Sequence, residues 1–155
     1  MRAPLRGRQA GFSLIEVLIS VLILAVGLLG AAAIQLNALK FTDSSRMTSQ
    51  ASFVAYDMLD RIRANPNGSY VLANLTSAPS ASNYTSPRDQ DLYDFAQNIR
   101  NFDPLTGDGS IAVTGRVVTI TVYWSDARAM NSTDAAASRR SFVLTSRVAI
   151  DASIP

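Results

Sequence analysis

The chain has 155 residues, 48% of them hydrophobic, and it contains no cysteine and no histidine. It therefore lacks disulfides and thiolate ligands, as well as the commonest general base and the commonest metal-binding side chain. The formal net charge is +2, but three of the 14 basic residues lie within the first 11 positions. The other 11 basic residues face 12 acidic ones, a balance that argues against a nucleic-acid-binding surface.

A short basic segment, which contains Arg2, Arg6 and Arg8, precedes the only long apolar stretch. This stretch runs from Phe12 to Ile34, and about 20 residues suffice to cross a hydrocarbon core of about 30 Å as a helix. The arginines favour an orientation with the N-terminus inside and the C-terminal part outside. The sequence thus predicts one membrane-spanning segment close to the N-terminus.

Two simpler interpretations of this segment remain open. Ala31, Ala32 and Ala33 imitate a signal-peptidase site, although the stretch is longer than the apolar region of about 7–15 residues in a secretory signal. The other alternative is a signal-anchored protein with a long helical stalk.

Glu16 is the only glutamate in the chain, and no other ionisable side chain lies between Arg8 and Lys40. A charged side chain at membrane depth costs about 2.5–3.5 kcal/mol on insertion scales, so it is expected to have a function and a partner. Glu16 is therefore a candidate functional residue.

The helical pattern continues beyond the apolar stretch and predicts one helix from about Phe12 to Ala64. Pro66 ends the pattern. Between Lys40 and Arg46 the apolar stripe weakens, and we expect Asp43 and two serines to bend or loosen the helix there. In the second half, apolar residues recur at spacings of three and four. They are Met47, Ala51, Val54, Ala55, Met58, Leu59 and Ile62.

On the polar side of the same half, oppositely charged residues stand at spacings that allow ion pairs within a helix. Asp57 and Arg61 are four residues apart, and Asp60 and Arg63 are three apart.

The sequence of the C-terminal part predicts a small α+β arrangement of helix and sheet. Residues 66–90 are rich in Ser, Asn, Ala and Pro and indicate mostly loop, with a short strand over Tyr70 to Leu75 as one option. Asp91 to Phe102 has the spacing of an amphipathic helix. We expect a long helix whose C-terminal half packs on a small antiparallel sheet.

The sheet is predicted from two alternating segments, Arg116 to Trp124 and Ser141 to Ile150, which the polar connection from Ser125 to Arg140 joins as an antiparallel pair. In the first, Val118, Ile120, Val122 and Trp124 face one side. In the second, the expected inner face is Phe142, Leu144, Val148 and Ile150. Ile111 to Val113 either starts the first strand or forms its own.

The segment from Asp103 to Ser110 carries two acids and two glycines, which is the composition of a calcium loop. Its spacing does not match an EF-hand, and the region has no glutamate for bidentate binding. A turn between the helix and the sheet is the better interpretation. Tyr123 and Trp124 are expected to be rim and core residues, not a ligand platform. We predict no cofactor, no metal and no catalytic residues.

The sequence Gly11-Phe12-Ser13-Leu14-Ile15-Glu16 resembles the processing site of type IV prepilins and of their relatives, the pseudopilins. The resemblance implies cleavage by a prepilin peptidase after Gly11, N-methylation of Phe12, and pairing of Glu16 with the freed amino group of a neighbouring subunit, which fixes the axial register. It divides the chain into a leader (1–11), a membrane and filament-core half-helix (12–35), an amphipathic half-helix (36–65) and a globular head (66–155).

Further phrases resemble the minor pilins of the PilV family, also called type IV pilus modification proteins. They are Ser49-Gln50-Ala51, the run from Ala55 to Pro66, the segment from Gly107 to Ile111, and the Thr- and Val-rich strand that ends in Tyr123-Trp124-Ser125-Asp126. This resemblance implies a structural subunit that primes pilus assembly and supports adhesion or twitching motility. The implied partners are other minor pilins, the major pilin and an adhesin-like tip protein. The subunit would sit in the bacterial inner membrane with its head in the periplasm, and later in the pilus.

Three other functions fit the sequence less well. A pseudopilin of a type II secretion system has the same architecture and is the nearest alternative. A DNA-uptake pilin is less favoured, because the chain without its basic leader is almost neutral. An anchored enzyme is not supported by any motif.

Overall fold

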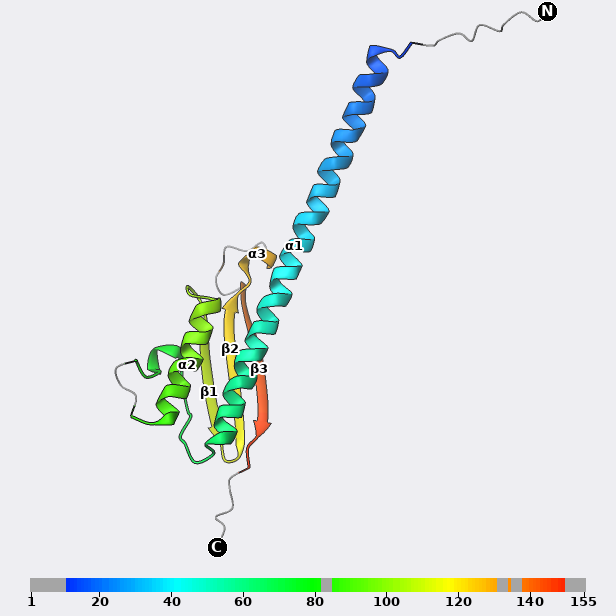
Figure 1. Ribbon diagram of the computed structural model, residues 1–155. Coiled ribbons are helices and arrows are strands. Elements are labelled where there is room, and N and C mark those ends of the chain that lie inside the picture. Colours follow the sequence, from blue (N-terminus) through cyan, green and yellow to red (C-terminus); the bar gives the residue numbers. More distant parts are fainter. Residues whose placement is uncertain (1–10, 82–84, 131–133, 135–137, 150–155) are drawn as a thin grey trace, which may run out of the picture. The chain divides into compact units, whose positions relative to one another are not determined.

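The computed structural model describes residues 11–81, 85–130, 134 and 138–149. The chain divides into two units, Met1–Leu39 and Lys40–Pro155, and helix α1 (Leu14–Ala64) has residues in both. The other elements belong to the second unit (Figure 1). In chain order they are the 3₁₀ turn η1 (Leu75–Ser77), α2 (Pro87–Phe102), β1 (Asp108–Thr114), β2 (Val117–Ser125), α3 (Ala127–Met130) and β3 (Arg139–Arg147). The predicted α+β class is confirmed.

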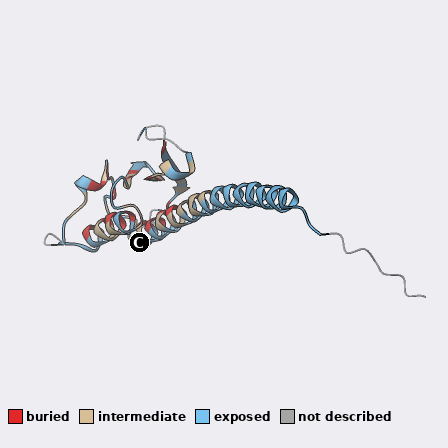
Figure 2. Cartoon of the chain, turned by 90° about the horizontal axis from the view of Figure 1, so that it is seen from above, coloured by how far each residue is buried: buried red, intermediate tan, exposed pale blue. Residues whose placement is uncertain are grey.

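In the first unit, every residue of α1 from Leu14 to Leu39 is exposed (Figure 2). The helix assignment continues without a break through the segment from Lys40 to Arg46, where the apolar stripe weakens, so the helix is not interrupted there. The polar residues there serve contacts within the second unit. The hydroxyl of Ser44 donates to Asp126 at 2.6 Å, and Asp43 pairs with Arg128 at 3.1 Å.

The second half of α1 buries the predicted apolar stripe. Met47 and Val54 are half-buried against the core, and the remaining five residues of the stripe are buried. The helix ends at Ala64, as the turn-forming sequence before Pro66 predicts. Both predicted ion pairs form on its polar side, Arg61 with Asp57 at 2.9 Å and Arg63 with Asp60 at 3.0 Å.

The sheet is antiparallel with the order β1-β2-β3. Ile120 in the central strand lies opposite Ile111 in β1 and Leu144 in β3. The sequence allows Ile111 to Val113 either to start the strand over Arg116 to Trp124 or to form a separate strand. The structure shows the second arrangement, because these residues belong to β1. Gly115, with a φ of 60°, lies in the two-residue turn between β1 and β2. A glycine adopts this left-handed conformation without strain.

Two predicted strands differ from the structure. The segment from Tyr70 to Leu75 forms only an isolated bridge between Leu72 and Ile111, because the backbone turns into η1 at Leu75. Strand β3 begins two residues earlier than expected and ends at Arg147. Val148, just past its end, is buried, and its N–H donates to the carbonyl of Arg116 at 2.9 Å. The predicted core residue Ile150 lies outside the described residues.

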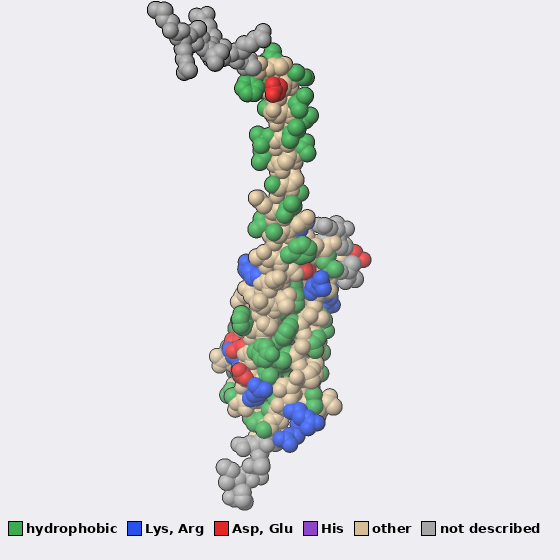
Figure 3. All heavy atoms as spheres, turned by 90° about the vertical axis from the view of Figure 1, so that its right-hand side faces the viewer, with side chains coloured by type: hydrophobic (Ala, Val, Ile, Leu, Met, Phe, Trp, Pro, Cys, Tyr) green, Lys and Arg blue, Asp and Glu red, His purple; other side chains and the backbone are tan. Residues whose placement is uncertain are grey.

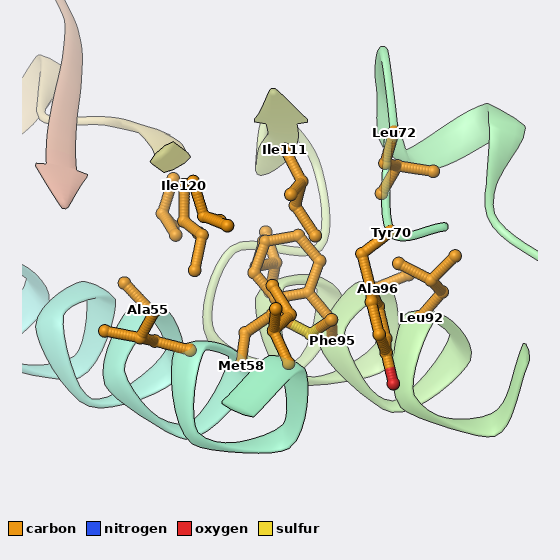
Figure 4. Close-up of a cluster of buried hydrophobic side chains, with 14 of the residues drawn as sticks. Ala55, Met58, Tyr70, Leu72, Leu92, Phe95, Ala96, Ile111 and Ile120 are labelled. Atoms are coloured by element: carbon orange, nitrogen blue, oxygen red, sulfur yellow. The ribbon is translucent and has the colours of Figure 1, made fainter. Parts of the chain in front are cut away.

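Helix α2 begins at Pro87, four residues before the expected start at Asp91. Ser86 caps it by accepting from the N–H of Asp89, and proline suits the first helical position. Helix α2 and the second half of α1 lie on one face of the sheet, and their buried side chains meet those of the strands (Figure 4). Met58 of α1, Phe95 of α2 and Ile120 of β2 all belong to this one core.

Candidate functional site: the start of helix α1

The predicted cleavage site lies just outside a helix. Gly11, Phe12 and Ser13 have no regular secondary structure, and α1 begins at Leu14. The side chain of Phe12 is 84% exposed. A Cβ added to Gly11 would meet no atom of the described residues within 4 Å. The fold described here therefore does not require glycine at position 11.

Ser13 forms the N-terminal cap of α1. Its carbonyl accepts from the N–H of Glu16 at 3.0 Å and from the N–H of Val17 at 3.2 Å. Its hydroxyl accepts from the N–H of Ile15 at 3.4 Å, which is the second residue of the helix. The cap leaves residues 11 and 12 as an exposed, non-helical extension.

Glu16 lies in the first turn of α1, where a carboxylate interacts favourably with the positive end of the helix dipole. Its side chain is exposed. Among the described residues, its carboxylate has neither a hydrogen bond nor an ion pair, although its backbone carbonyl accepts from the hydroxyl of Ser20 at 2.7 Å. The part of the chain that the structure describes therefore contains no partner for the carboxylate of Glu16.

The helix surface beyond Glu16 is apolar and open. Large side chains from Leu14 to Leu39 are between 49% and 85% exposed. Figure 3 shows them along the N-terminal stretch of α1, with one acidic side chain near its start. By length and composition, α1 is the one helix among the described residues that is able to cross a membrane. Gly27 and Gly30 have open space around them, so another helix could approach closely at these positions.

The acidic loop of the second unit is a helix cap and turn. Asp103 accepts from the N–H and hydroxyl of Thr106 and from the N–H of Ser125. Burial alone would raise the pKa of Asp103, but these hydrogen bonds outweigh it, and the pKa lies below its usual value. Asp108 accepts from the N–H of Leu75 and of Gly109. Both carboxylates are therefore used to hold the backbone in place.

The two aromatic residues at the end of β2 behave as expected. Trp124 is buried and packs edge-on against Phe102, with ring centres 6.4 Å apart. Tyr123, on the opposite face, is half-buried beneath the guanidinium of Arg139, 4.1 Å from its ring centre. The first is a core residue and the second a rim residue.

Sequence reasoning missed two arrangements. The cap at Ser13 could have been found, because Ser13 and Glu16 have the Ser-x-x-Glu spacing of a capping box. The other is a polar cluster around Arg61, which binds Asp91 at 3.2 Å and Asp94 at 2.8 Å on α2. Asp91 also accepts from the hydroxyl of Tyr70 at 2.7 Å, and burial together with this bond raises the pKa of Tyr70 to about 12.

In a comparison with protein families, residues 6–32 match the prokaryotic N-terminal methylation motif. No curated protein and no solved structure matches the chain. The motif supports the type IV pilin superfamily, as either a pilin-like protein or a pseudopilin, and such proteins are structural. It implies processing by a prepilin peptidase and assembly with other pilins. Together with the apolar helix, it fits a pilin anchored in the inner membrane.

Proposed function

We propose that this protein is a minor pilin of the PilV kind, a structural subunit that helps to initiate assembly of a type IV pilus. The observation that carries the proposal is the methylation motif over residues 6–32, which coincides with the exposed apolar start of α1. The motif supports the superfamily, and the resemblance of the segment from Ala55 to Pro66 favours PilV within it.

In this proposal a prepilin peptidase cuts the chain between Gly11 and Phe12, and the new amino group of Phe12 is methylated. Two observations support the position of the cut. The bond lies outside the helix, and the described fold gives no reason of its own for a glycine at position 11. A requirement for Gly11 would then come from the enzyme, since the missing side chain leaves room at the membrane surface.

Glu16 sets the register between subunits in this proposal. A lone carboxylate in lipid is costly, and pairing with the amino group of a neighbouring Phe12 would offset much of that cost. Its position in the first turn, exposed and unpaired among the described residues, leaves it available for such a partner.

The apolar half-helix would pass from the inner membrane into the core of the filament. Contacts between helices then replace contacts with lipid, and the small residues Gly27 and Gly30 permit close packing. Before assembly the head lies in the periplasm. Its partners are other minor pilins, the major pilin and an adhesin-like tip protein, and the assembled pilus serves adhesion or twitching motility.

Deleting the gene tests this function against its nearest alternative, a pseudopilin of a type II secretion system. We expect fewer surface pili and a loss of twitching, both restored by the intact gene, with protein secretion unchanged. Loss of secretion with normal pili would favour the pseudopilin and contradict the proposal. A DNA-uptake pilin would instead be indicated by salt-sensitive binding of DNA to the full chain.

A further inference from the structure

We propose that Ser13 is a positioning residue for cleavage, because its cap keeps the Gly11–Phe12 bond out of helix α1. The inference rests on the proposed function, since it takes the cut to fall between these two residues. It assigns a role to a side chain outside the predicted set of Gly11, Phe12 and Glu16.

The cap competes with the scissile carbonyl for one hydrogen-bond donor. In an α-helix, the carbonyl of residue i accepts from the N–H of residue i+4. If α1 extended back to Gly11, the carbonyl of Gly11 would therefore bind the N–H of Ile15. In the structure, that N–H donates to the hydroxyl of Ser13 at 3.4 Å.

The backbone bonds at the next position show the same boundary. The N–H of Glu16 donates to the carbonyl of Ser13 at 3.0 Å, where a longer helix would have it donate to the carbonyl of Phe12. As a result, the described contacts leave the carbonyls of Gly11 and Phe12 outside the helical bonding pattern.

This matters for the chemistry of the cut. Hydrolysis adds one water across the amide, breaks the bond between the carbonyl carbon of Gly11 and the nitrogen of Phe12, and leaves a carboxylate on Gly11 and an amine on Phe12. The water must reach a carbonyl that the enzyme can polarise. A carbonyl held in a helix would first have to be released from its bond to Ile15.

Replacing Ser13 by alanine removes the cap and favours helix at that position. From the usual strength of a serine cap, we expect the Ser13→Ala precursor to be cleaved about fivefold more slowly than wild type. Ser13→Thr retains a capping hydroxyl and should be cleaved at close to the wild-type rate. Ser20→Ala is the matched control, because Ser20 is a serine of α1 whose hydroxyl bonds within the helix and not at its end.

The test uses full-length precursor in membranes that contain the prepilin peptidase, with initial rates of leader release measured by mass spectrometry. A Ser13→Ala precursor cleaved as fast as wild type would overturn the inference. So would a Ser13→Thr precursor as slow as Ser13→Ala, because the enzyme would then be reading the serine itself.

A second measurement separates the cap from direct recognition by the enzyme. The backbone carbon-13 shifts of Phe12, in full-length uncleaved precursor in detergent micelles, should move toward helical values in Ser13→Ala and stay in place in Ser13→Thr and Ser20→Ala. Slower cleavage without this movement would contradict the cap. If wild-type precursor is not cut between Gly11 and Phe12 at all, the proposed function fails, whereas the shifts still report on the cap.

Discussion

Two opposing effects determine the free energy of the charged carboxylate of Glu16. Its place in the first helical turn stabilises a carboxylate through the helix dipole, by about 0.3–1 kcal/mol at exposed sites. Transfer of its charge into lipid costs more, about 2.5–3.5 kcal/mol on insertion scales. The dipole alone thus cannot account for a charge at this position, and a positively charged partner from another subunit can.

We expect Glu16→Ala to be processed and methylated normally but to enter filaments poorly, because the register contact is lost. Glu16→Gln should be similarly impaired if charge is what the partner reads, whereas Ser20→Ala, one turn further along, should assemble normally. The measurement is the ratio of subunit in sheared fibres to subunit in membranes. Normal incorporation of Glu16→Ala would contradict the register role.

A functional residue is easier to identify from the sequence when its type conflicts with its neighbours than when its type is common at that position. A lone acid in an apolar stretch has an obvious cost, so Glu16 can be identified from the sequence alone. Serine is an ordinary residue at a helix start. Only the bond from the N–H of Ile15 to its hydroxyl shows that Ser13 takes the donor that the carbonyl of Gly11 would use in a longer helix. The partners of Arg61 on α2 are 30 and 33 residues away, so no local pattern could predict them.

At the scale of elements, Arg61 ties the second half of α1 to α2. It contacts three carboxylates, those of Asp57, Asp91 and Asp94, and its side chain is about one-third exposed. Charge-assisted hydrogen bonds of this kind are stronger than an isolated surface pair. The cluster therefore orients two helices that also share an apolar core.

Arg61→Ala should lower the free energy of unfolding of the head by about 1–2 kcal/mol, since it leaves several aspartates close together without their shared cation. Arg63→Ala, whose ion pair with Asp60 is largely exposed, should cost less than about 0.5 kcal/mol. Urea unfolding of the full chain in detergent can be followed by the fluorescence of Trp124, the single tryptophan. Equal losses for both variants would show that the cluster adds nothing.

Elements whose apolar residues recur at regular spacing were predictable from the sequence. Elements whose bounds depend on contacts with distant parts of the chain were not. The stripe of α1 and the alternation of β2 each follow from one buried face. The first turn of α2 is polar, so apolar spacing placed its start late, although Ser86 and Pro87 form a recognisable helix start. Residues 70–75 have strand-like composition, but only Leu72 reaches β1.

At the scale of the whole molecule, the two units differ in whether their apolar side chains are buried within the chain. The second unit buries an apolar core of its own, with Ile120 and Val122 fully enclosed. The first unit encloses none of its apolar residues from Leu14 to Leu39. A surface of that kind needs lipid or other helices around it, and a pilin that moves from membrane to filament would meet both in turn.

The most direct test of this account is mass spectrometry of the intact mature protein, taken from sheared surface fibres and from membranes of the same cells. The account predicts a chain that begins at Phe12, carries one methyl group on its amine, and is present in the fibre fraction. A chain that keeps Met1, or one that is cut after Ala33 and never found with fibres, would contradict it.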